Sequence, residues 1–97
     1  MKKVFLFVHN AGTEKRDYLA RVLDQIPEID TWRYDMTNCF YLVSESDATT
    51  IGSRIREKTT TALGAAAARF IVAEIGDYWG YATEETWYLL ANKRHKT

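Results

Sequence analysis

The chain has 97 residues, of which 46% are hydrophobic and 27% charged, as in one ordinary globular domain. Thirteen basic residues balance thirteen acidic ones, which argues against general electrostatic binding to nucleic acid or to an anionic membrane. The one cysteine excludes an internal disulfide and a zinc site made of several cysteines. The apolar run at residues 4–8 is far shorter than the ~20 residues that span a bilayer, so we expect a cytoplasmic protein without a membrane partner.

The first half of the chain predicts a strand, a helix and a hairpin. Residues 3–8 (KVFLFV) form a continuous apolar run, typical of a strand that is buried on both faces and therefore central in its sheet. Thr13 is a suitable N-cap for a helix that Pro27 closes. Residues 31–36 alternate in polarity, and residues 39–43 (CFYLV) follow after a short turn, which predicts a hairpin whose second strand is also central.

The second half predicts a helix, a strand and a last helix. Residues 44–47 (SESD) offer helix caps, and the helix that follows them is expected to fray before Gly64, because the threonines 59–61 weaken its helix propensity. Residues 69–75 (RFIVAEI) predict a fourth strand. Thr83 can cap a final helix that runs to about Asn92.

The predicted order is strand, helix, strand, strand, helix, strand and a terminal helix. This order indicates an α+β fold, the ferredoxin-like βαββαβ sandwich with an antiparallel sheet, extended by a C-terminal helix. In that topology the first and third strands are central, as their composition also predicts, and the second and fourth lie at the edges. Without a linker or a repeat, we expect one ferredoxin-like domain over residues 1–92 and a basic tail over residues 93–97.

Three of the predicted strands are apolar on both faces, in the segments 4–8 (VFLFV), 39–43 (CFYLV) and 70–73 (FIVA). Two helices cover one face of such a sheet, and a bare second face would be a liability because each large apolar side chain gains roughly 1.5–3 kcal/mol on burial. We therefore expect a two-fold homodimer. Its predicted seam contains Phe70, Val72, Trp79, Tyr81 and Trp87. The competing cover is the terminal helix, folded back through Trp87 and Leu90.

The segments TWRYDMTNCFYLV, SESDATTIGSRIRE and RFIVAEIGDYWGY resemble small bacterial proteins described as SinR-like. Those proteins share the ferredoxin-like fold with the small dimeric subunit of CRISPR adaptation and with VapD-type toxins. The resemblance covers most of the chain between residues 3 and 81. It rests on Trp32, the hairpin residues 35–38, Ser46 and the strand residues 72–75. It implies a homodimer.

The end of the first strand is the candidate catalytic position. The nuclease-like relatives carry an acidic residue there that helps to hold a divalent metal, whereas this chain has His9 and Asn10, and neither is the anionic oxygen ligand that Mg²⁺ prefers. We expect no metal and no cofactor. His9 could serve acid–base chemistry in a ribonuclease without a metal, or be a hydrogen-bonded histidine at a strand end. Asn10 and Thr13 could bind an anion, or only cap and turn the chain.

Aromatic and basic residues gather near the C-terminus, where two of the three tryptophans and three of the six tyrosines lie. Tyr78 and Trp79 could stack on unpaired bases, with Arg69 and Arg94 to contact nucleic acid beside them. The same aromatic side chains could instead fill a dimer seam, where Trp and Tyr are enriched.

No nucleotide-binding glycine loop, serine triad or His/Cys metal spacing is present in the sequence. We therefore expect a homodimeric ferredoxin-like interaction module without clear catalytic machinery, with a further protein partner left open. The alternative is a small dimeric nuclease or nucleic-acid-binding protein of the class of the CRISPR-adaptation subunit, which as an enzyme would be an endonuclease or ribonuclease. A third hypothesis is a regulator that binds a ligand through the aromatic loop.

Overall fold

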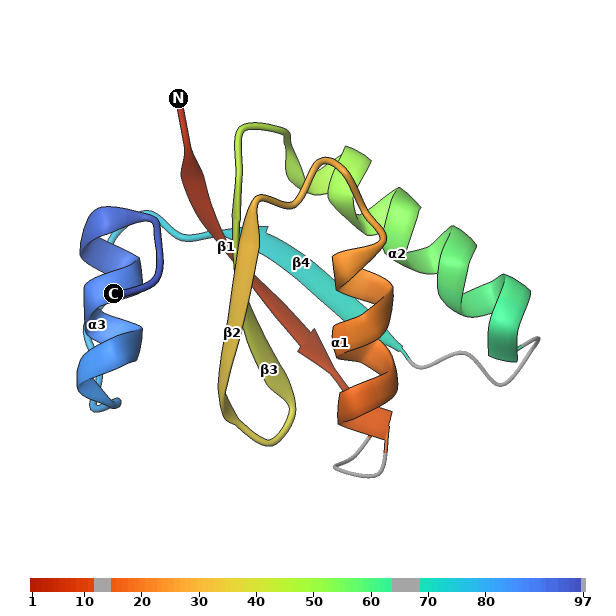
Figure 1. The fold of residues 1–97 in the computed structure, drawn as a ribbon, viewed down its shortest axis with the longest axis horizontal. Coiled ribbons are helices and arrows are strands. Elements are labelled where there is room, and N and C mark those ends of the chain that lie inside the picture. The colour runs from red at the N-terminus through yellow and green to blue at the C-terminus, as the bar shows by residue number, and fades with distance from the viewer. Residues whose placement is uncertain (12–14, 64–68, 97) are drawn as a thin grey trace.

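A four-stranded antiparallel sheet forms the centre of the computed structural model, which describes residues 1–11, 15–63 and 69–96 (Figure 1). The described strands are β1 (Lys3–His9), β2 (Thr31–Met36), β3 (Cys39–Ser44) and β4 (Phe70–Glu74). The described helices are α1 (Arg16–Asp24), α2 (Ala48–Leu63) and α3 (Glu84–Asn92). In Figure 1, α1 and α2 lie on one side of the sheet and α3 lies on the other. The chain thus has an α+β fold.

The sheet order is β2-β3-β1-β4, and every neighbouring pair is antiparallel. The prediction that the first and third strands are central, with the second and fourth at the edges, is confirmed. The hairpin strand β2 has the predicted bounds, and α2 includes the threonines 59–61 and ends at Leu63, directly before Gly64. Thr13, the predicted cap of the first helix, lies outside the described residues.

The main core lies between the sheet and the helices α1 and α2. Apolar side chains recur on each helix at helical spacing, as in Ile51 and Ile55 one turn apart on α2, so that each helix presents one stripe to the sheet. The carboxylate of Asp47 accepts the backbone N–H of Thr50 (2.7 Å) and so caps the start of α2. The fully buried members of this core include Phe5, Phe7, Leu19, Leu23, Phe40, Leu42, Ile51 and Ile55.

The helix α3 covers part of the opposite face of the sheet. Its buried residues Leu89 and Leu90 pack against a second cluster of side chains on β1 and β3. The members on the sheet are Val4, Tyr41 and Val43, with Leu6 partly buried beside them. The competing cover predicted from the sequence, the terminal helix, is therefore the cover observed over this part of the face.

A polar network attaches the start of α3 to the edge strand β2. Arg33 donates from Nε to the hydroxyl of Thr86 (2.9 Å) and from its guanidinium to the hydroxyl of Thr83 (3.0 Å). The Asp35 carboxylate accepts from the backbone N–H of Thr83 (3.1 Å) and from the hydroxyl of Thr86 (3.2 Å). Thr86 is fully buried, so its hydroxyl joins a cation and an anion at the partly buried side of this network, where such bonds are stronger than in water.

Replacing Thr86 by valine keeps the shape of the side chain but removes the buried hydroxyl that accepts from Arg33 and donates to Asp35, while the bonds of both residues to Thr83 remain. We expect the free energy of unfolding, measured by urea denaturation, to fall by about 1–3 kcal/mol. Thr49→Val makes the same substitution at an exposed position of α2, where we expect a change within about 0.5 kcal/mol. Equal losses in the two variants would show that the network does not hold α3.

Candidate functional site

His9 ends β1 with its side chain inside the domain. The side chain is 4% exposed, and its ring centroid lies 5.4 Å from that of Phe7 and 5.7 Å from that of Phe40. Nδ1 accepts the backbone N–H of Ala11 (3.1 Å), and Nε2 has no partner within the described part of the chain. Burial lowers the pKa of His9 below its usual value. The structure therefore places His9 as a hydrogen-bonded histidine at a strand end, among aromatic rings.

Asn10 and Arg69 are brought together where β1 ends and β4 begins. The backbone N–H of Asn10 donates to the carbonyl of Arg69 (3.2 Å), and the Asn10 side-chain oxygen accepts the backbone N–H of Arg69 (2.9 Å). Arg94 follows α3, and its guanidinium lies over the ring of Tyr88 at 5.3 Å. Because the start of β4 and the helix α3 lie on opposite sides of the domain in Figure 1, the predicted nucleic-acid residues do not form one surface.

A row of four apolar side chains crosses the sheet on the face that α3 only partly covers. The register pairs Ile71 of β4 with Val8 of β1, Val8 with Cys39 of β3, and Cys39 with Met36 of β2. Ile71 is 70% exposed, Met36 50% and Val8 46%. Burial raises the pKa of the Cys39 thiol, which keeps this member of the row uncharged. These four residues, the apolar row, cross all four strands of the sheet.

A cavity of about 390 Å³ lies beside the apolar row, under the connection between β4 and α3. Its lining is rich in aromatic side chains, namely Tyr41, Tyr78, Trp79, Tyr81 and Trp87. Trp79 and Tyr81 are 90% and 89% exposed. Among the described residues that line this cavity, the charged ones are Glu74 and Asp77, and both are acidic. A phosphate backbone would therefore meet like charge here.

Two of the residues predicted for the dimer seam lie away from the free face of the sheet. Phe70 and Val72 lie on the helix-covered face of β4 and pack against the main core, so they are not on the free face. The Phe70 ring meets that of Phe7 edge-on at 5.5 Å. Strand alternation separates two faces but does not say which one the helices cover, and the free face of β4 carries Ile71 instead. Of the other predicted seam residues, Trp87 is partly buried by its own chain, whereas Trp79 and Tyr81 are exposed.

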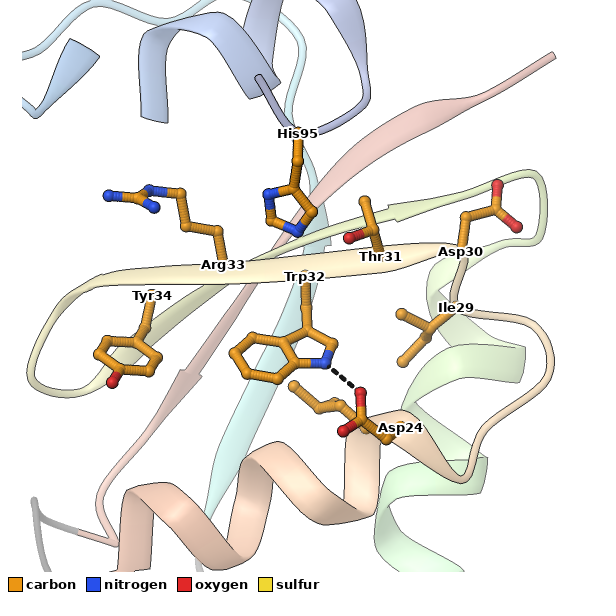
Figure 2. Close-up of a pocket in the computed structure, with 9 residues that line it drawn as sticks. Asp24, Ile29, Asp30, Thr31, Trp32, Arg33, Tyr34 and His95 are labelled. Carbon is orange, nitrogen blue, oxygen red and sulfur yellow. Dashed lines mark hydrogen bonds between the residues drawn. The ribbon is translucent and has the colours of Figure 1, made fainter. Parts of the chain in front are cut away.

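A second cavity, of about 620 Å³, lies at the outer edge of β2 (Figure 2). Trp32 and Tyr34 point from β2 toward α1 with their rings stacked at 6.2 Å, and the Trp32 indole N–H donates to Asp24 (2.6 Å). The guanidinium of Arg16 lies 4.2 Å over the Tyr34 ring, and His95 stands on the other side of the strand. This cavity was not predicted from the sequence, although the alternation of residues 31–36 puts two large aromatic side chains on one side of an edge strand.

No family model, curated protein or solved structure matches this chain. Within residues 1–11, 15–63 and 69–96, no three His, Cys, Asp or Glu side chains gather closely enough to hold a metal ion. In the same described residues, no helix is both long and apolar enough to span a bilayer. The resemblance to SinR-like proteins therefore stays a prediction, and the function has to be argued from the surfaces described above.

The buried His9 predicts a pH dependence of stability. Its pKa in the folded state lies below the unfolded value of 6.5, so the stability that it contributes as a neutral group is fully present above that pH and is lost as the pH falls toward the folded pKa. We expect the free energy of unfolding, from urea titrations between about pH 7 and pH 5, to fall more steeply in the wild type than in His9→Asn. The asparagine amide oxygen can still accept the N–H of Ala11 but does not titrate.

The exposed His95 provides the control for this measurement. His95→Asn makes the same substitution at an exposed position, so an effect common to both variants would not report on the burial of His9. If His9→Asn were as pH-dependent as the wild type, His9 would not be a buried neutral group.

Proposed function

We propose that this chain is a ferredoxin-like interaction module that pairs with a second copy of itself through the part of the sheet that α3 leaves uncovered. The ferredoxin-like assignment is supported by the chain order β1-α1-β2-β3-α2-β4 and by an antiparallel sheet with β1 and β3 in the centre. In this assignment α3 is an addition after the last strand of the fold. The resemblance to SinR-like proteins points in the same direction.

The observation that carries the proposal is the apolar row. Neighbouring strands lie about 4.8 Å apart, so a row with one member on each of four strands spans the whole width of the sheet. Trp79 and Tyr81, both largely exposed, extend the apolar surface beside it. Monomeric proteins rarely expose a contiguous apolar surface of this kind, and Trp and Tyr are enriched at the centre of interfaces.

A second copy fits this surface because the row is uncharged and the chain has no net charge. A two-fold axis through the row brings it against the same row of the other copy, which is the self-complementary contact of a symmetric dimer. No charge on the row has to be desolvated, and two neutral chains do not repel each other. The exposed side of Ile71 would then be buried in the seam.

Nucleic acid fits the same surface less well. The described charged residues that line the neighbouring cavity, Glu74 and Asp77, are acidic and would oppose a polyanion. Arg69 directly precedes β4 and Arg94 follows α3, and the start of β4 and the helix α3 lie on opposite sides of the domain in Figure 1. His9, the predicted catalytic residue of the nuclease alternative, is buried among rings. These observations favour the interaction module.

The dimer is tested by Ile71→Asp, which places a carboxylate at the β4 end of the apolar row. We expect light scattering to give the mass of two chains for the wild type and of one chain for the variant, because the carboxylate would have to be desolvated without a partner. Ile71 is 70% exposed in one chain, so the variant should keep its fold, which circular dichroism checks.

Thr49→Asp is the matched control, since it adds the same charge at an exposed position on α2 and should remain a dimer. A wild type that has the mass of one chain at all concentrations up to about 1 mM would contradict the proposal, because the association would then be weaker than about −4 kcal/mol.

A further inference from the structure

The cavity at the outer edge of β2 is lined by every residue from Ile29 to Tyr34 in succession. Side chains of a strand point alternately to its two faces, so a cavity on one face would be lined by every second residue. A cavity lined by consecutive residues therefore runs along the backbone edge of the strand. Figure 2 shows this arrangement, with α1 on one side of β2 and His95 on the other. The cavity is a groove whose floor is the edge of β2.

The floor of the groove carries unpaired backbone groups. Within the described sheet β2 pairs with β3 alone, so half of its N–H and C=O groups point outward. Apart from the ladder with β3, the backbone hydrogen bonds between segments of the described residues do not involve residues 31–34. These groups are spaced as in any strand, and the ligand that matches such a spacing is another extended backbone.

The usual protection of an edge strand is weak here. Natural edges are blocked by proline, lysine, bulges or charged side chains. β2 contains neither proline nor lysine, and its irregularity lies at its far end, between Tyr34 and Met36. Its charged side chains, Arg33 and Asp35, are engaged by Thr83 and Thr86 of the network that holds α3. The edge from Thr31 to Tyr34 stays open.

The side chains that line the groove on the α1 side favour a ligand with positively charged side chains. They are the stacked rings of Trp32 and Tyr34, with the exposed carboxylate of Asp24 at the indole. A cation is favoured both by aromatic faces and by a carboxylate. The structure contains an example, since Arg16 already places its guanidinium over the Tyr34 ring. If another strand were added beside β2, a basic side chain on this side of it would lie near the Trp32 ring and the Asp24 carboxylate.

We infer that the groove binds an extended segment of a partner protein, which adds to the sheet as a strand beside β2 and places lysine or arginine side chains at alternate positions toward Trp32 and Asp24. This inference is independent of the proposed dimer, because none of the residues that line the groove belongs to the apolar row. The Ile71→Asp variant should therefore bind the same segment as the wild type does.

The test begins with a phage-displayed library of random peptides about ten residues long, which is the upper length of an ordinary strand. We expect enrichment on the wild-type protein of sequences with a basic residue at every second position. The enriched peptide is then synthesised in two forms, N-methylated at one or the other alternate set of amides. Methylation of the set that faces β2 should abolish binding, and methylation of the other set should leave it nearly unchanged, because only one set donates to the strand.

Asp24→Asn tests this side of the groove without removing the acceptor for the Trp32 indole. We expect the affinity for the enriched peptide, measured by fluorescence anisotropy, to fall about threefold, as for the loss of one exposed ion pair. Asp17→Asn removes the same charge from an exposed position of α1 outside the groove and should leave the affinity unchanged.

Three results would overturn the inference. The first is a library without enrichment over the unselected pool. The second is equal sensitivity to both methylation patterns, which would indicate binding through side chains alone. The third is protection of the outward β2 amides from hydrogen exchange in the absence of peptide, which would mean that a second copy occupies the edge.

Discussion

The structure depends on one constraint, which is that a single sheet with two apolar faces has to be covered by the helices of one short chain. Two helices, α1 and α2, cover the first face. The second face has only α3, whose nine residues extend about 13 Å and reach the side chains of Val4, Tyr41 and Val43 but not the apolar row. The surface available for association is what this short helix leaves uncovered.

Most elements of the fold could be predicted from local patterns in the sequence. The continuous apolar run of β1, the alternation in β2 and the cap at Thr83 depend on neighbouring residues, and the structure agrees with each of them. The choice of face on β4 could not be predicted, because alternation distinguishes two faces without saying which one meets the helices. The attachment of α3 to β2 could not be predicted from the sequence either, since Arg33 and Thr86 are 53 positions apart in the chain.

The apolar row and the groove at β2 consist of residues that the fold brings together, and no sequence motif marks them. Ile71 and Val8 are ordinary strand residues in the sequence, and they become neighbours through the pairing of β4 with β1. The groove at β2 depends in the same way on α1 and on the residues after α3, which meet only in the folded chain. The burial of His9 could not be predicted either, because the sequence does not show which face of β1 its side chain joins.

The end of α3 has a practical consequence for work on this protein. Lys93 adopts a left-handed conformation (φ 57°), which stops the helix and reverses the chain, so that His95 stands over β2 and Lys96 reaches back to Glu84. An affinity tag or fluorescent fusion attached after this turn would start beside the open edge of the sheet and could obstruct it. Met1 is 98% exposed and does not line the groove, so the N-terminus is the better point of attachment.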